Sequence, residues 1–553
     1  MNRPWLTHYD PQVPTHLDYP AVPLFYFLEQ AALRFPENNC TVFNDLTISY
    51  RRMEQLSNRL AVSLVTLGVQ KGDRVGLCMP NIPQFVIAFY AILKAGGVVV
   101  ALNPMYRKME MNFQLSDAGV ELVICHAGAL PVLRSLESTQ NIKRIVTWLE
   151  DADLLAFGLE EQCSPHAGDL QPCELAFMDL LQPGQEDNHL SIQVTPEDPA
   201  VIQYSGGTTG TPKGAIGLHR NLVANTLQFR AWLSHMKDGQ ETVLTAIPLY
   251  HVYGMVIGMS MGIALGARLV LISDPRNLAD LLEKIQHYHP SIFPGVPGMY
   301  HAINQYPDVQ AGRYDLRSIQ ACISGSAPLL EDVKQRFEEI TGGKLVEGYG
   351  LSEAPTATHC NPLLGENRTG SIGLPLPDVD ARIVSLEDGL TEMPVGEAGE
   401  LIVRSPQVMQ GYYNRPEENE LALRDGWLYT GDVARMDADG YFYLVDRKKE
   451  VIKAGGFQVW PREVEEVIAS HPAVVEVGVA GVNRPGRGET VKAWVVLKPG
   501  EACNEENIQA WCDERLVNYK VPAEVEFIER LPRSGVGKVL RRELVRLDRE
   551  RDA

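Results

Sequence analysis

The sequence lacks the patterns that mark common metal sites and disulfide frameworks. Its nine cysteines are an odd number, and no two are spaced as Cys-x-x-Cys, which disfavours both kinds of site. Basic residues are also outnumbered, since 50 Lys and Arg stand against 70 Asp and Glu, giving a net charge of −20. A chain this acidic is a poor candidate for broad nucleic-acid binding, although it can still form a local basic pocket for an anionic cofactor. Scattered, reduced cysteines fit a cytoplasmic location.

Targeting and membrane-spanning segments are missing as well. The first five residues, Met-Asn-Arg-Pro-Trp, lack the apolar core of a signal peptide. An uncharged run over 252–267 has glycine at every fourth position and ends at Arg268, short of the ~18–20 residues that a membrane span needs. We expect a buried helix whose glycine face admits another element or a ligand tail, with core packing alone as an equal alternative. Peripheral membrane contact and a homodimer are left open.

Strands alternate with helices through the first two-thirds of the chain. Apolar runs at 74–79, 97–101, 121–125 and 144–148 predict strands, and the almost wholly apolar segment 83–94 predicts a buried helix. This alternation indicates an α/β fold with a parallel, doubly wound sheet. Residues 150–190 are acidic and punctuated by Gly and Pro, so we expect a surface excursion there.

One glycine-rich stretch, residues 204–215, follows the apolar run 200–202 directly. It reads Tyr-Ser-Gly-Gly-Thr-Thr-Gly-Thr-Pro-Lys-Gly-Ala. Glycines let backbone N–H groups turn toward one anion, hydroxyls add donors and the lysine adds a point charge suited to phosphate. The spacing is not that of a Walker A loop, and a solvated linker is the alternative interpretation. The candidate phosphate ligands are Ser205, Gly206, Gly207, Thr208, Thr209, Gly210 and Lys213.

These twelve residues resemble the phosphate loop of the adenylate-forming superfamily, which contains acyl-CoA synthetases, luciferases and peptide-synthetase adenylation domains. Further motifs of that superfamily follow in its order at 248–254, 324–328, 348–353, 425–432, 446–450 and 532–542. The resemblance spans essentially the whole chain. It is closest to the fatty acyl-CoA synthetases, because of Ser-Gly-Gly-Thr-Thr-Gly and the closing Asp-Arg-Lys-Lys.

The resemblance implies where a nucleotide binds. A small-residue turn would pack against adenine, a Gly-Tyr-Gly-Leu-Ser-Glu motif would meet base and phosphate, and Glu353 would hold Mg²⁺ together with substrate phosphates. The family's usual Thr in this motif is Ser352 here, which keeps the hydroxyl. The ATP- and AMP-binding candidates from these two motifs are Gly325, Ser326, Ala327, Gly348, Tyr349, Gly350 and Ser352.

The resemblance also implies an acyl pocket beside a histidine. His251 follows a strand and matches the family's element at the junction of the acyl and nucleotide sites. The resemblance implies a catalytic role for it. The alternative is a structural histidine whose ring is hydrogen-bonded to the backbone. Tyr253, Met255 and Met259 would line the pocket. Long-chain enzymes often carry an aromatic gate where this sequence has Met255.

A second domain is expected at 447–553, after a first domain at 1–446. By the resemblance, Asp432 takes the ribose hydroxyls with help from Arg447, and a small mobile α+β domain turns about Lys449. Residues 474–482 and 492–498 predict strands of this domain, and Pro461 predicts the start of a helix. By the same resemblance, Gly455, Gly456 and Phe457 line the tunnel for the pantetheine arm of coenzyme A. Lys453 and Lys538 are expected to be catalytic.

The implied activity is ATP-dependent ligation of a medium- or long-chain fatty acid to coenzyme A. The carboxylate would attack the α-phosphorus of Mg·ATP to give acyl-AMP and pyrophosphate, and the coenzyme A thiol would then displace AMP. Aryl acids of the coumarate type, and delivery of the acyl group to a carrier protein or to oxygen, are alternative functions. A non-catalytic binding protein that kept the fold is a third.

Overall fold

The structure is a computed structural model that describes residues 3–136, 142–158, 166–182, 192–205, 212–454, 457–484, 488–533 and 539–552. Within these ranges, every helix is too short or too polar to cross a bilayer. The eight cysteines in these ranges are free thiols.

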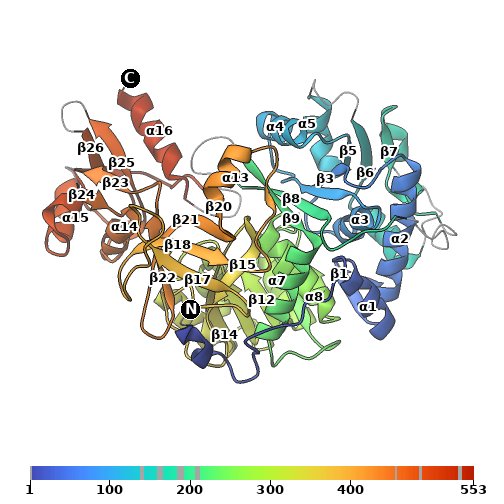
Figure 1. The fold of residues 1–553 in the computed structure, drawn as a ribbon, viewed down its shortest axis with the longest axis horizontal. Helices are drawn as coiled ribbons and strands as arrows, with labels where there is room; N and C mark the ends of the chain where they lie inside the picture. The colour runs from blue at the N-terminus through green and yellow to red at the C-terminus, as the bar shows by residue number, and fades with distance from the viewer. Residues whose placement is uncertain are drawn as a thin grey trace. The chain divides into compact units, whose positions relative to one another are not determined.

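The chain folds into two compact units (Figure 1). The larger contains the described residues up to Asp380 together with Arg404–Leu428, and the smaller contains Ala381–Val403 and the described residues from Tyr429 onward. The functional hinge expected near Lys449, with a boundary after residue 446, stays a prediction.

An eight-stranded sheet forms one part of the larger unit, in the order β19-β9-β8-β4-β3-β5-β6-β7. The run from β8 to β7 is parallel, and β9 and β19 are antiparallel additions at one edge. Its strands are β3 (Arg74–Cys78), β4 (Val98–Ala101), β5 (Leu122–His126), β6 (Lys143–Thr147), β7 (Glu174–Ala176), β8 (Pro199–Ser205), β9 (Lys213–Leu218) and β19 (Gly411–Tyr412). The prediction that residues 150–190 form a surface excursion is wrong for residues 174–176, because these form β7 and extend the sheet by pairing with β6.

The helices between these strands follow the apolar pattern. The residues of α3 (Pro83–Lys94) are all buried, as its composition predicts, and Pro83 begins the helix where a missing N–H costs nothing. The other helices of this part are α4 (Lys108–Ala118), α5 (Leu130–Arg134) and α6 (Asp151–Phe157). A core of valines, leucines and cysteines, including Val100, Leu115 and Val123, fills the space between α4, α5 and the sheet.

A nine-stranded sheet forms the rest of the larger unit, in the order β16-β15-β14-β13-β12-β10-β11-β1-β2. Its centre, from β14 to β1, is parallel, and both edges are antiparallel. Its strands are β1 (Asn39–Phe43), β2 (Leu46–Ser49), β10 (Thr242–Thr245), β11 (Arg268–Leu271), β12 (Ile292–Gly295), β13 (Ala321–Ser324), β14 (Lys344–Leu351), β15 (Ala354–Cys360) and β16 (Leu374–Pro375). The expected α/β fold is therefore confirmed.

The helices of this second part include a pair that lies side by side, α1 and α2 (blue in Figure 1). Helix α2 begins at Tyr50, and the Ser49 side chain accepts a hydrogen bond from the Arg52 N–H at 3.2 Å, which caps it. The helices are α1 (Tyr26–Arg34), α2 (Tyr50–Thr66), α7 (His219–Trp232), α8 (Met261–Ala264), α9 (Leu278–Tyr288), α10 (Pro297–Gln305), α11 (Pro307–Gln310) and α12 (Glu331–Thr341). Helix α13 (Pro416–Ala422) instead contacts β19 of the eight-stranded sheet.

The glycine run at 254–266 is a buried helix, as expected, and its first part is a π-helical segment, η6 (Gly254–Ser260), that continues into α8. Protein packing accounts for three of the four glycines. An added Cβ would lie 2.3 Å from the Pro248 carbonyl at Gly254, 2.6 Å from Leu269 at Gly262 and 2.3 Å from Phe35 at Gly266. At Gly258 the nearest atom would be 3.6 Å away, an ordinary contact distance, so close packing does not require glycine at this position.

The smaller unit contains two sheets. In one, β17 (Asp380–Val384), β18 (Gly399–Arg404) and β21 (Trp427–Met436) are neighbours, and β22 (Phe442–Arg447) pairs with β21. The short β20 (Leu423–Arg424), which belongs to the larger unit, pairs with the first two residues of β21. The boundaries between the two units fall inside β17, β18 and β21, so the chain passes from one unit to the other within strands.

The second sheet of the smaller unit has helices on both faces. Helix α14 begins at Pro461, as predicted, and packs with α15 against Val479, whereas α16 packs against the next residue, Ala480. Neighbouring strand residues point to opposite faces, which is why two separate cores form. The elements are β23 (Ile452–Ala454), β24 (Phe457–Val459), α14 (Pro461–Ala469), β25 (Val474–Arg484), β26 (Gly488–Leu497), α15 (Glu505–Asp513), β27 (Glu524–Phe527) and α16 (Arg541–Asp552).

Candidate functional site

The two ends of the predicted phosphate loop are held together by strand pairing. Strands β8 and β9 are antiparallel, and Ser205 pairs directly with Lys213 at their open end. Gly206, Gly207, Thr208, Thr209 and Gly210 lie outside the described residues, so their expected contacts stay predictions. The strand ends nevertheless place one hydroxyl and one ammonium group at the mouth of the loop.

Glu353, the predicted magnesium ligand, lies at this mouth. Its Oε1 accepts hydrogen bonds from the Ser205 hydroxyl at 3.3 Å and from the Tyr412 hydroxyl at 2.8 Å. The predicted phosphate and metal residues are thus neighbours in the larger unit, although 148 residues separate Ser205 from Glu353.

A single carboxylate at this place fits magnesium chemistry. The described residues contain no cluster of three His, Cys, Asp or Glu side chains suited to a metal ion. Mg²⁺ bound with a nucleotide needs only one or two carboxylates, because substrate phosphates and water complete its shell. Within the described part, both hydrogen bonds to the Glu353 carboxylate fall on Oε1, which leaves Oε2 for a cation.

Lys213 is paired with an acid, Glu418, that belongs to none of the predicted motifs. Its ammonium lies 3.3 Å from Glu418 Oε1 and 5.3 Å from the centre of the Tyr412 ring. Partial desolvation opposes the effect, but the Lys213 charge lowers the pKa of Glu418, so this carboxylate is ionised at neutral pH. An arriving phosphate would compete with Glu418 for the same ammonium.

This competition gives a testable prediction for Glu418→Gln. The variant should bind ATP about 1.4- to fivefold more tightly, because a partly exposed ion pair of this kind contributes about 0.2–1 kcal/mol. Calorimetric titration with ATP at fixed ionic strength measures the effect, and the gain should shrink as salt is added. Glu417→Gln is the matched control, since Glu417 is the exposed neighbour. Unchanged or weaker binding by Glu418→Gln would refute the competition.

A partly buried acid, Asp117, links the segment after β19 to the phosphate-loop strands. Asp117 accepts hydrogen bonds from the Tyr204 hydroxyl at 2.7 Å and from Arg415 Nη2 at 2.5 Å. Tyr412 itself is opposite Ala215 in the β19–β9 pairing. Sequence reasoning missed Asp117, Tyr412, Arg415 and Glu418, because their types and spacing are ordinary and only the strand order brings them together.

The predicted histidine motif and adenine turn meet through Tyr253. Its hydroxyl donates to the carbonyl of Ile323 at 2.6 Å and lies 3.2 Å from that of Gly295. A Cβ on Gly325 would lie 3.3 Å from the Tyr253 ring, so this turn lies directly against the aromatic face. Ser326 follows with a positive φ of 72° and an exposed side chain, and Ala327 is half-buried.

His251 itself is half-buried and electrically neutral. Burial lowers its pKa to about 4. Its Nδ1 accepts a hydrogen bond from the Tyr253 N–H at 3.2 Å, which leaves Nε2 as the N–H donor of the neutral ring. Met255 and Met259 are fully buried in η6, so their side chains belong to the protein interior and not to its solvent-exposed surface.

The Gly-Tyr-Gly motif lies at the turn of strands β14 and β15. Gly350 needs to be glycine, since a Cβ there would lie 1.7 Å from the Thr356 carbonyl. The Tyr349 ring is buried and packs edge-to-face on His359, with centroids 5.9 Å apart. Gly348 and Ser352 are half-buried. The roles predicted for this motif in nucleotide binding stay predictions.

In the smaller unit, the predicted ribose ligand is already paired with its predicted helper. Asp432 and Arg447 face each other across β21 and β22, and Arg447 Nε lies 3.3 Å from Asp432 Oδ1. Lys449 lies on an exposed turn after β22, and Lys453 is exposed on β23 with its backbone N–H donating to Glu489 Oε2 at 2.8 Å. Phe457 begins β24. Lys538, Gly455 and Gly456 lie outside the described residues.

A second feature that sequence reasoning missed is a buried arginine in the same unit. Arg541 forms a two-bond pair with Glu465 at 2.6 and 3.0 Å and also bonds Asp446 at 3.0 Å and Glu450. Burial works against the charge, but these carboxylates outweigh it and raise the pKa of Arg541. The start of α16 is thereby attached to the segment that ends β22.

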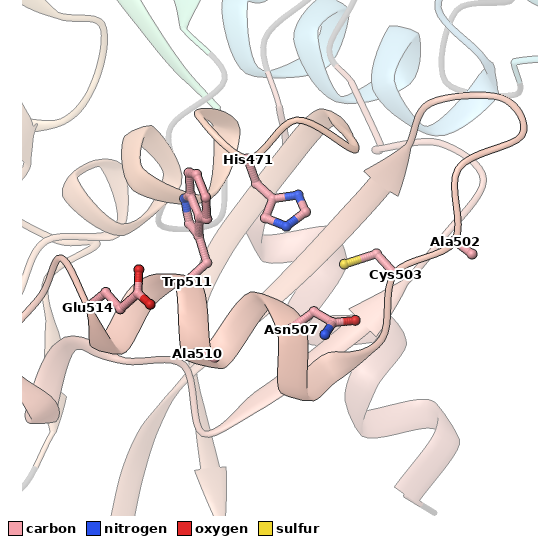
Figure 2. Close-up of a pocket in the computed structure, with 7 residues that line it drawn as sticks. All are labelled: His471, Ala502, Cys503, Asn507, Ala510, Trp511 and Glu514. Carbon is pink, nitrogen blue, oxygen red and sulfur yellow. The ribbon is translucent and has the colours of Figure 1, made fainter.

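A surface pocket of the smaller unit is separate from this chemistry. Figure 2 shows His471, Cys503 and Trp511 among its lining residues, with the Cys503 sulfur turned toward the His471 ring. Trp511 is occupied by packing, since its indole N–H donates to the Val467 carbonyl at 3.0 Å and Arg515 covers its ring. None of the expected site residues that the structure describes lines this pocket.

Comparison with known proteins agrees with these observations. The AMP-binding enzyme family model matches residues 28–413, and the model of the AMP-binding enzyme C-terminal domain matches 463–538. The chain is 42% identical to a protein of Bacillus subtilis (strain 168) named "Long-chain-fatty-acid--CoA ligase", over 99% of this chain and 98% of that protein. A protein of the same name from Escherichia coli O6:H1 is 35% identical over 98% of both chains.

Solved structures give the same result. ATP-bound MatB from Rhodopseudomonas palustris is 27% identical and superposes with a TM-score of 0.83, covering 95% of this chain and 99% of that one. The predicted resemblance is confirmed, since one family model alone covers more than half of the residues. The chain belongs to the AMP-binding enzyme family.

Proposed function

We propose that the protein is an AMP-forming ligase that joins a long-chain fatty acid to coenzyme A. The observation that carries the proposal is the meeting of Ser205, Lys213 and Glu353 at the open end of β8 and β9. A phosphate loop with an ammonium on one side and a metal-binding carboxylate on the other is what a nucleotide triphosphate needs. The full-length likeness to relatives named long-chain-fatty-acid–CoA ligases supports the choice of acid and thiol.

The first step forms a mixed anhydride. A carboxylate oxygen of the acid attacks the α-phosphorus of ATP, the bond to the β-phosphate oxygen breaks, and pyrophosphate leaves. Lys213 binds the departing phosphates, and Lys538 supplies positive charge to the reacting oxygens. Glu353 would hold a magnesium ion, which would supply further positive charge beside the phosphates. Asp432 accepts the ribose hydroxyls, as a carboxylate can accept two donors at once.

The second step transfers the acyl group. The coenzyme A sulfur attacks the acyl carbon, AMP leaves with the electron pair of the anhydride bond, and a thioester remains. His251 orients the acyl carbonyl through its neutral ring, and Lys453, Gly455, Gly456 and Phe457 line the path of the thiol arm. No side chain becomes covalently attached, so the protein acts through positioning and electrostatics.

The alkyl chain is assigned to the space beside Gly258. Of the four glycines in the run, Gly258 is the one at which an added Cβ would meet no atom closer than 3.6 Å, and Met255 and Met259 are adaptable neighbours for a flexible chain. An aryl acid of the coumarate type and transfer to a carrier protein are the alternative functions. We further propose a cytoplasmic location; peripheral membrane contact and a homodimer stay predictions.

A panel of carboxylic acids, scored by AMP release with and without coenzyme A, tests the function. We expect the largest coenzyme A-dependent AMP release with straight-chain acids of long chain length, and a thioester product by mass spectrometry. Faster turnover with aryl acids would favour the coumarate-type alternative. AMP release that does not depend on coenzyme A but increases with an acyl carrier protein would favour transfer to a carrier protein.

A further inference from the structure

Tyr412 lies between the two charged groups at the mouth of the phosphate loop. Its hydroxyl donates to Glu353 Oε1 at 2.8 Å, and its ring faces the Lys213 ammonium at 5.3 Å from the ring centre. One side chain therefore contacts both the proposed metal ligand and the proposed phosphate ligand. No other role in the proposed reaction has been given to it.

The position of Tyr412 is fixed by its own backbone. It pairs with Ala215 on β9, its N–H donates to Asn419 Oδ1 at 2.6 Å, and its carbonyl accepts from Asn419 Nδ2 at 3.2 Å. The phenol is the donor in its hydrogen bond to Glu353, because an ionised carboxylate can only accept.

The two contacts have different consequences. The hydrogen bond occupies one oxygen of Glu353 and so limits rotation of the carboxylate, which turns Oε2 toward a cation in a fixed direction. The ring face attracts an ammonium by its quadrupole and thus limits where Lys213 can lie. Together they set the spacing between a metal-binding anion and a phosphate-binding cation.

We propose that Tyr412 is a positioning residue for the metal–nucleotide complex: its hydroxyl aligns Glu353 for Mg²⁺, and its ring aligns Lys213 for the phosphates. This inference rests on the proposed function, because it takes Glu353 as the metal ligand. It adds a residue from a strand, β19, that supplies none of the expected site residues.

Equilibrium binding separates the two contacts without requiring turnover. Calorimetric titration gives the dissociation constant of ATP with Mg²⁺ and with EDTA, and the ratio of the two is the magnesium gain. In Tyr412→Phe, which keeps the ring and loses the hydroxyl, we expect the magnesium gain to fall about tenfold, the effect of losing a hydrogen bond to a charged group. Binding of metal-free ATP should change less than about twofold, because the ring remains.

Two further variants make the test specific. Tyr412→Leu removes the ring as well and should also weaken binding of metal-free ATP. Tyr413→Phe removes the neighbouring phenol and should leave both constants unchanged. In a Glu353→Gln background, which removes most of the magnesium gain by itself, Tyr412→Phe should have little additional effect, since the two residues act as one unit.

Several results would overturn the inference. An unchanged magnesium gain in Tyr412→Phe would do so. So would an equal fall in the magnesium gain when Tyr412→Phe is made in the wild type and in the Glu353→Gln background. A magnesium gain that survives Glu353→Gln would also reject it, because the hydroxyl would then have no metal ligand to align. Failure of the proposed function is a separate result, namely no acid-dependent AMP release by the wild-type protein, and the binding measurements do not depend on it.

Discussion

Replacing Lys538 by alanine is expected to slow acyl-adenylate formation by about two to three orders of magnitude, the effect of removing one donor aimed at developing negative charge. Thioester formation from supplied acyl-AMP should stay near the wild-type rate, because that step no longer involves attack on phosphorus. Acid-dependent pyrophosphate exchange measures the first step, and thioester formation from synthetic acyl-AMP and coenzyme A measures the second.

The described residues on either side of the segment that carries Lys538 contact each other. Arg533 and Val539 form an isolated antiparallel bridge, and the Leu540 N–H donates to the Pro532 carbonyl at 2.9 Å. These contacts close the base of the segment that carries the lysine, so its backbone enters and leaves at one place. Lys498→Ala, an exposed lysine of the same unit, is the control and should affect neither step. Equal losses in both half-reactions of Lys538→Ala would refute the assignment.

The second large effect is expected at Arg541, which the reaction does not contact directly. Arg541→Met keeps much of the apolar volume but leaves Asp446, Glu450 and Glu465 together without their cation. Removing one partner of a buried ion pair typically costs about 3–5 kcal/mol. The melting temperature should therefore fall by several degrees, and the protein should also lose adenylation activity, because the start of α16 would no longer be attached beside Asp446.

The pH dependence of this loss identifies its cause. Burial raises the pKa of Glu465, and Arg541 opposes that effect, so removing the arginine raises this pKa further. A carboxyl group whose folded-state pKa exceeds its unfolded value binds more protons when folded, so its contribution to stability improves as the pH falls. The difference in melting temperature between Arg541→Met and wild type should consequently be smaller at pH 5.5 than at pH 7.5.

Arg546 provides the matched control on the same helix. It pairs with Glu543 at 2.8 Å and with Glu550, and its side chain is 54% exposed. Arg546→Met should change stability by less than about 0.5 kcal/mol at either pH, as exposed pairs usually do. If Arg541→Met and Arg546→Met have the same melting temperature, the ion pairs of Arg541 are not what stabilises the position of α16.

Local patterns in the sequence predicted much of the larger unit because its elements are strongly apolar. Helix 83–94 was correct to the residue, since it begins with a proline and is apolar on most sides. Strand β7 was missed, because three residues in an acidic, Gly-punctuated segment carry no periodic signal, and only pairing with β6 makes them a strand.

The residues of the candidate site also divide into those that local sequence patterns predicted and those that they did not. Ser205, Lys213 and Glu353 belong to motifs whose residue types are informative by themselves. Tyr412, Glu418 and Arg541 belong to no such pattern, and each becomes informative through partners far away in sequence. Tyr412 is 59 residues from Glu353, and Arg541 is 76 residues from Glu465. Contacts of this length follow from strand order and helix packing, which no local window contains.

The course of the chain through strands β17, β18 and β21 has a practical consequence for dissecting the protein. A fragment that began at residue 429 would carry most of the smaller unit but not Ala381–Val403, and so it would lack β18, the neighbour of β21. The exposed backbone of β21 would then offer unpaired donors and acceptors to other copies, a common origin of insoluble material. Expression of the C-terminal region by itself therefore requires the 381–403 hairpin to be spliced back in, rather than a simple truncation.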